Sequence, residues 1–158
     1  MLKKLNLKLI FIESAFLFFL ITGVKRLYIA TQADIYHALM RNDYHAVESL
    51  TDQTMGEILA NPYRLMLGSF IVGILLIAII NWKYKTSILN TILTFVIIFP
   101  MYPLGVFHNG FIARLFNTFC YLFSKNSATA FFIGGVIILF GAFSLLRTSI
   151  IINKDSNQ

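Results

Sequence analysis

Four apolar runs alternate with polar segments along the chain, and each run approaches the length of a membrane span. A hydrocarbon core of about 30 Å requires about 20 predominantly apolar residues in a helix. We therefore expect an all-α integral membrane protein with one membrane domain, residues 1–158, in which four transmembrane helices form a bundle. The expected spans lie at about 7–26, 64–82, 87–104 and 128–152.

The polar segment at 27–63 predicts the first outer loop. It contains five of the seven acidic residues of the chain. Turn and capping residues predict short helices over about 30–62, with Asp43 as an N-cap and Asn61-Pro62 as a stop signal.

The segment at 105–127 predicts the second outer loop. Phenylalanine or leucine recurs there at every fourth position, and polar residues lie between, which favours a Phe-rich helix over about 106–123 in the membrane interface. Pro100 and Pro103 are expected to bend the third span just before this helix.

The composition agrees with a membrane protein, because 58% of the residues are hydrophobic and the mean hydropathy is +0.75. The basic residues behind the net charge of +6 lie at the ends of apolar runs, which predicts contact with the lipid bilayer and disfavours nucleic-acid binding.

Three lysines and no acid precede the first run, so we expect a retained first span with cytoplasmic N- and C-termini. These lysines and the absence of an Asn-x-Ser/Thr site favour a bacterial inner membrane.

The segment LIFIESAFLFF, residues 9–19, places Glu13 inside the first apolar run. Counted from nearby lysines, Glu13, Asn90 and Arg147 lie at a similar depth on three spans. Intramembrane charges usually face the bundle interior and pair, so we predict a Glu13–Arg147 ion pair, with Asn90 and Ser144 in the same polar cluster. Such a pair would specify the fold or a partner; the alternatives are a proton or ion site, or a Glu13 that reaches the interface without a partner.

Small residues at four-residue spacing predict close helix packing in two of the spans. They are Ser69 and Gly73 in the second span, and Ala130, Gly134 and Gly135 in the fourth. These residues would serve packing within the chain or docking of another helix.

Few residues suggest catalysis or metal binding. His37 and His45 each have a carboxylate three positions away, but no metal-site or nucleophile signature is present, so we expect no metal, no cofactor and no catalytic residue. Cys120 is the only cysteine, which excludes a disulfide within the chain, and we expect it to be buried and inert. The residues expected to contact lipid headgroups or a partner on the outer side are Arg26, Arg64, His108 and Arg114.

The plan of a small, basic, four-span protein with both ends in the cytoplasm resembles, in topology, that of immunity proteins against pore-forming bacteriocins. We expect a non-catalytic protein that acts by protein–protein contact, as an accessory subunit of a membrane complex or as an immunity-type blocker of a pore-forming toxin. Its partner would be another membrane protein or a second copy of the chain. Two alternatives stay open: a transporter or channel component that uses Glu13, and an interfacial lipid-processing enzyme that uses His108, Asn109 and Arg114.

Overall fold

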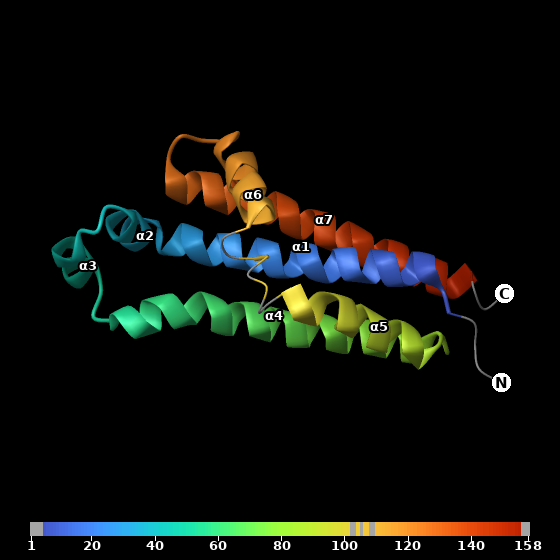
Figure 1. The fold of residues 1–158 in the computed structure, drawn as a ribbon. Helices are drawn as coiled ribbons and strands as arrows, with labels where there is room; N and C mark the ends of the chain where they lie inside the picture. The colour runs from blue at the N-terminus through green and yellow to red at the C-terminus, as the bar shows by residue number, and fades with distance from the viewer. Residues whose placement is uncertain (1–4, 102–103, 105, 108–109, 156–158) are drawn as a thin grey trace.

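The computed structural model describes residues 5–101, 104, 106–107 and 110–155, and within these residues the chain is helical and has no β-strand (Figure 1). The all-α prediction is confirmed. The helices in chain order are α1 (Leu7–Thr31), α2 (Ala33–Met40), α3 (Tyr44–Leu50), α4 (Met55–Lys83), α5 (Ile88–Ile98), the 3₁₀ helix η1 (Phe99–Met101), α6 (Phe111–Tyr121) and α7 (Ser127–Asp155).

Three helices, α1, α4 and α7, are long and apolar enough to span a membrane. They contain 25, 29 and 29 residues. At a rise of 1.5 Å per residue they extend about 38 to 44 Å, more than the hydrocarbon core. The expected spans at 7–26, 64–82 and 128–152 lie within these helices, which supports membrane association. The first helix begins, and the last ends, at the same end of the bundle (Figure 1).

The segment expected as the third span, 87–104, differs from the prediction. Its α-helix, α5, has 11 residues, about 17 Å, and continues only through the three residues of η1. Pro100 explains the early end, since it has no N–H to donate and disfavours helical geometry at the residue before it. α5 is therefore too short to cross the membrane alone. Pro103 lies outside the described residues.

The expected Phe-rich helix at 106–123 corresponds to α6, which packs against α7 and α1. The predicted aromatic stripe does not form one face, because Phe107 lies before the helix and is buried, whereas Phe111 is exposed. Phe116, which is not part of the stripe, makes the ring contacts between α6 and α1. Its ring centroid lies 5.8 Å from that of Phe18 and 5.9 Å from that of Phe19.

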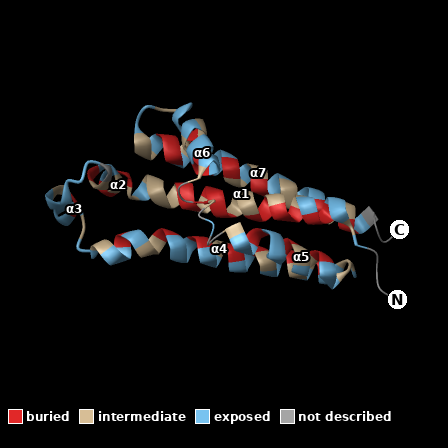
Figure 2. Ribbon diagram, in the orientation of Figure 1, coloured by how far each residue is buried: buried red, intermediate tan, exposed pale blue. Residues whose placement is uncertain are grey.

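The central helix of the bundle is α1. α4 and α7 run antiparallel to it, and α5 lies against both α1 and α4 (Figure 1). Buried residues line the length of α1, whereas α4 and α5 are exposed over much of their surface (Figure 2). The buried members of the main core are Phe16, Leu17, Ile21, Met66, Phe70, Ile77, Ile98, Phe107 and Ala142.

α2, α3 and the start of α4 form a small subdomain at one end of the bundle (Figure 1). It has a separate core of Ile35, Ala38, Val47 and Ile58. Asp43 caps α3 as predicted, because its carboxylate accepts a hydrogen bond from the Ala46 N–H at 3.1 Å.

The predicted stop at Asn61-Pro62 is wrong, because Pro62 lies inside α4. A proline at this position leaves the carbonyl of Ile58, four residues earlier, without its helical donor. The hydroxyl of Tyr36 donates to that carbonyl at 3.4 Å. Burial raises the pKa of Tyr36 to about 12, so the hydroxyl keeps its proton at neutral pH. Tyr36 therefore compensates for the hydrogen bond that the proline removes.

We expect Tyr36→Phe to destabilise the protein by about 1 kcal/mol, because it leaves a buried carbonyl unpaired. The melting temperature in mild detergent, measured by circular dichroism, should fall by about 2–4 °C. Tyr44→Phe, at an exposed ring on α3, is the control and should melt like the wild type. If both variants melted like the wild type, the role assigned to Tyr36 would be wrong.

Candidate functional site

The candidate site is a polar cluster around Glu13, which is fully buried in α1. The side chain of Asn6 caps the start of α1 by accepting a hydrogen bond from the Leu9 N–H at 3.1 Å. The backbone N–H of Asn6 donates to Oδ1 of Asn90 in α5 at 3.2 Å. These two bonds fix the start of α1 against α5, and Glu13 lies about 10 Å further along the helix.

Three hydrogen bonds hold the Glu13 carboxylate, each from a different helix. Oε2 accepts from Nδ2 of Asn81 in α4 at 3.3 Å and from Oγ1 of Thr94 in α5 at 3.4 Å. Oε1 accepts from Oγ of Ser149 in α7 at 3.2 Å. The cluster therefore joins α1 to α4, α5 and α7.

Asn81 connects Glu13 to a second set of polar side chains. Its Nδ2 also donates to Oγ1 of Thr91 at 2.9 Å. Its Oδ1 accepts from Oγ1 of Thr86 at 3.1 Å and from Nδ2 of Asn153 at 3.0 Å. Asn81 thus links α4 to α5 and α7 as well as to α1.

The structure does not form the predicted Glu13–Arg147 ion pair. Arg147 is exposed and precedes Ser149 by two residues, which places it about 200° away around α7. The Ser144 hydroxyl donates to the carbonyl of Phe140 in its own helix, so it does not join the cluster. Asn90 is buried as expected, and its side chain accepts a hydrogen bond from the backbone N–H of Asn6.

Sequence reasoning missed Asn81, Thr94, Ser149 and Asn153. The sequence contains a pattern that indicates a polar helix face. Asn90 and Thr94 lie four residues apart, as do Ser149 and Asn153, so each pair shares one face of its helix. Depth and charge, on which the prediction rests, do not distinguish the inner face of a helix from the outer one.

Glu13 is the only titratable side chain in this cluster, and the described residues contain no group of three or more His, Cys, Asp or Glu that could hold a metal ion. No protein family model, curated protein or solved structure matches this chain. The geometry provides a carboxylate that accepts from hydroxyls and from an amide, all buried between helices.

Arg26 does not contact lipid headgroups as expected, because it is buried against α6. Its Nη2 donates to the carbonyl of Ala113 at 3.0 Å and to Oδ1 of Asn117 at 2.8 Å. Its guanidinium carbon lies 5.9 Å from the ring centroid of Phe116. The neighbouring Lys25 donates to the carbonyl of Phe107. These two cations hold α6 and the segment before it against α1.

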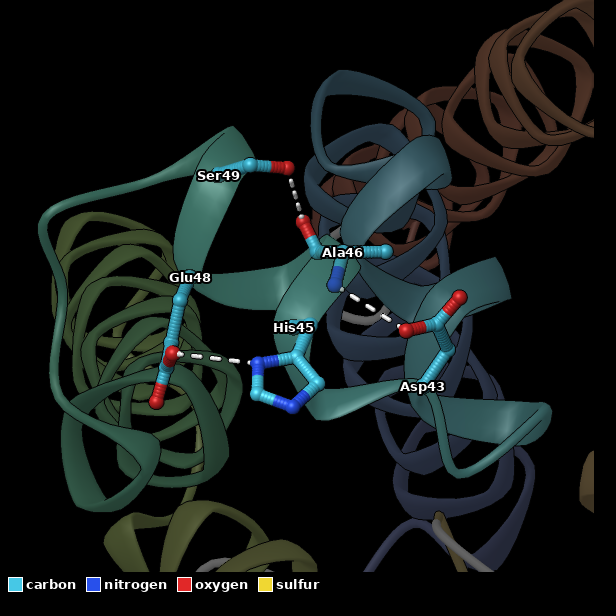
Figure 3. Close-up of polar contacts among 5 residues, drawn as sticks. All are labelled: Asp43, His45, Ala46, Glu48 and Ser49. Atoms are coloured by element: carbon cyan, nitrogen blue, oxygen red, sulfur yellow. Dashed lines mark hydrogen bonds and ion pairs between the residues drawn. The ribbon is translucent and has the colours of Figure 1, made fainter.

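The other outer-side candidates are not brought together. Arg64 and Arg114 are exposed, and His108 lies outside the described residues. His45 Nδ1 lies 3.9 Å from Glu48 Oε2 on the surface of α3 (Figure 3). Both side chains are fully exposed, so this pair contributes little to stability.

The small residues pack within the chain. An added side chain at Gly73 would meet Leu17 of α1, and one at Gly135 would meet Leu27 of α1. Gly134 lies against Cys120 of α6, and Ala130 is buried in the same group. The Ser69 hydroxyl donates to the carbonyl of Leu65 in its own helix.

Proposed function

We propose that this protein is a non-catalytic membrane protein that acts by protein–protein contact, as an accessory subunit of a membrane complex or as an immunity-type blocker of a pore-forming toxin. The observation that supports this proposal is a groove of about 600 Å³ between α4 and α5. Its walls are apolar and include Leu75, Ala78 and Ile92. Such a groove on a lipid-facing surface suits the side chains of another helix.

Polar residues at one side of the groove define the kind of helix that fits it. Asn81, Thr86 and Thr91 line the groove beside its apolar walls. We therefore propose as its occupant a transmembrane helix of a partner protein that has apolar side chains and one hydroxyl or amide. In lipid, such a polar pair favours association by about 1 kcal/mol.

The distribution of charge supports the proposed orientation. Exposed Lys8, Lys83, Lys85, Arg147 and Lys154 gather at the end of the bundle where α1 begins and α7 ends. The exposed acids of the outer subdomain lie at the opposite end. In the proposed topology the chain crosses the membrane a third time between α4 and α7, and both termini lie in the cytoplasm of a bacterium, at its inner membrane, in accordance with the positive-inside rule.

The two alternative functions have less support. The Glu13 cluster is enclosed by four helices, so it does not resemble a water-lined translocation path. A lipid-processing enzyme would need Arg114 beside an acid or base. Arg114 is exposed on α6. The other two residues of the enzyme alternative, His108 and Asn109, lie outside the described residues.

The groove can be tested by photocross-linking in the native membrane. We expect benzoylphenylalanine at Ile92, a groove wall, to form one protein adduct, whereas the same group at Phe140, exposed on α7, should form none. Ala78→Trp fills the groove and should remove both the adduct and co-purification of the adduct protein. Identical adducts from Ile92 and Phe140, or an adduct that persists in Ala78→Trp, would contradict the proposal.

A further inference from the structure

A second groove, of about 460 Å³, follows α1. The residues of α1 that line it extend from Leu7 to Phe19, and Ile98 of α5 and Met101 of η1 also belong to its walls. The α5 residues that line the groove proposed for a partner helix, such as Ile92, do not line this one. The two grooves are therefore separate sites.

The dimensions of this groove suit a single hydrocarbon chain. Leu7 and Phe19 are twelve positions apart, which is about 18 Å along α1 and close to half of a hydrocarbon core of about 30 Å. A volume of about 460 Å³ spread over this length corresponds to a channel about 5 Å across. A helix with its side chains is about 10–12 Å wide. A methylene chain is only about 4 Å thick, because carbon atoms in contact lie at about that distance.

The groove is open at the end where α1 begins and is bounded by aromatic rings near the other end. At the open end, Leu7 and Phe11 are 73% and 76% exposed. Near the other end, the ring centroid of Phe18 lies 5.2 Å from that of Phe107 and 5.8 Å from that of Phe116. A chain that enters from the membrane surface beside Leu7 would therefore end against these rings, near the middle of the bilayer.

Lys8 places a positive charge at the open end. It is exposed, and it precedes Phe11 by three positions and Ala15 by seven, so it lies on the same face of α1 as these two groove residues. A lysine near the end of a membrane helix extends its ammonium group to the headgroups and attracts anionic lipids. Of the described residues that line the groove, only Ser14 is polar, and it is buried. The groove thus combines one cation at the membrane surface with an apolar interior.

We propose that this groove binds an anionic phospholipid, with one acyl chain along α1 and the phosphate group beside Lys8. The apolar walls fit the chain, and the charge at the open end fits the headgroup. The second acyl chain stays in the surrounding bilayer. The inference does not depend on the partner helix proposed above, because the two grooves share no lining residue.

Native mass spectrometry of the purified full-length protein tests this inference. The protein is incubated in detergent micelles with equal amounts of phosphatidylglycerol and phosphatidylcholine that have the same acyl chains. We expect one lipid to stay bound, with phosphatidylglycerol about fivefold more abundant than phosphatidylcholine. Lys8→Gln should bind both lipids equally. Lys83→Gln, at an exposed lysine at the end of α4, is the control and should keep the preference.

The groove itself is tested by Ala15→Trp, which fills it and should abolish retention of the lipid. The matched control is Ala78→Trp, because Ala78 is also half-buried but lines the groove between α4 and α5. It should retain the lipid like the wild type. A wild type that retains no lipid, or one whose preference persists in Lys8→Gln, would overturn the proposal even if Ala15→Trp did not fold. Loss of the lipid in Ala78→Trp but not in Ala15→Trp would also overturn it and assign the lipid to the other groove.

Discussion

Asn81→Leu should lower the free energy of unfolding by about 3 kcal/mol, the largest loss we expect from a polar substitution in this protein. Asn81 donates to Glu13 and Thr91 and accepts from Thr86 and Asn153. Leucine is similar in size, so the change removes these bonds without opening a large cavity. Buried groups on Glu13 and Asn153 and partly buried hydroxyls on Thr86 and Thr91 then lose a partner, and groups left unsatisfied account for most of the cost.

Unfolding of Asn81→Leu can be followed by circular dichroism during titration with sodium dodecyl sulfate. The matched control is Ser144→Leu, because Ser144 is exposed and donates only to the Phe140 carbonyl of its own helix. We expect the control to unfold at the wild-type midpoint. If Asn81→Leu were as stable as Ser144→Leu, the network would not hold the four helices together.

Gly134→Val should release α6 from the bundle. A Cβ atom at Gly134 would meet the Sγ of Cys120 and would lie 3.0 Å from the Cα of the same residue. Backbone cannot move aside as a flexible side chain can, so α6 has to shift. We expect a cost of about 3 kcal/mol in the docking of α6, at the upper end of the usual range for overpacking.

Cys120 reports directly on this shift because it is the only cysteine of the chain and is fully buried. Because the thiol is buried, labelling of the wild type by a maleimide should be slow. A loss of 3 kcal/mol corresponds to labelling about 100-fold faster in Gly134→Val. Gly68→Val is the control, because nothing lies within 4 Å of a Cβ at Gly68. Unchanged labelling in Gly134→Val would show that α6 tolerates the added side chain.

The sequence predicts the long helices well and the third crossing poorly. Runs of apolar residues are sufficient to locate α1, α4 and α7, because length and hydropathy decide whether a helix can span a membrane. A proline, by contrast, does not always end a helix. Pro100 ends α5, whereas Pro62 lies within α4, where Tyr36 supplies a donor to the freed carbonyl. The difference depends on a residue 26 positions away in sequence, which local patterns do not reveal.

The sequence indicates how deep in the membrane the polar residues lie, but not on which face of its helix each side chain lies. Counting residues from the lysines predicts polar residues of the third and fourth spans at the depth of Glu13, and the structure places Thr94 and Ser149 beside Glu13. Pairing by charge then favoured Arg147, whereas the structure turns this long cation outward and places the short side chain of Ser149 inside. Long basic side chains near a helix end can reach the headgroups from an outward face, so charge complementarity was a weaker guide than side-chain size.

The buried charges of α1 have a consequence for how the chain is made. Glu13, Lys25 and Arg26 all lie inside the bundle, and their partners come from α4, α5, α6, α7 and the segment before α6. When α1 leaves the ribosome, none of these partners has been synthesised. A helix with three exposed charges inserts poorly into lipid by itself. α1 therefore acquires the last of these partners, Ser149, only after α7 has been synthesised.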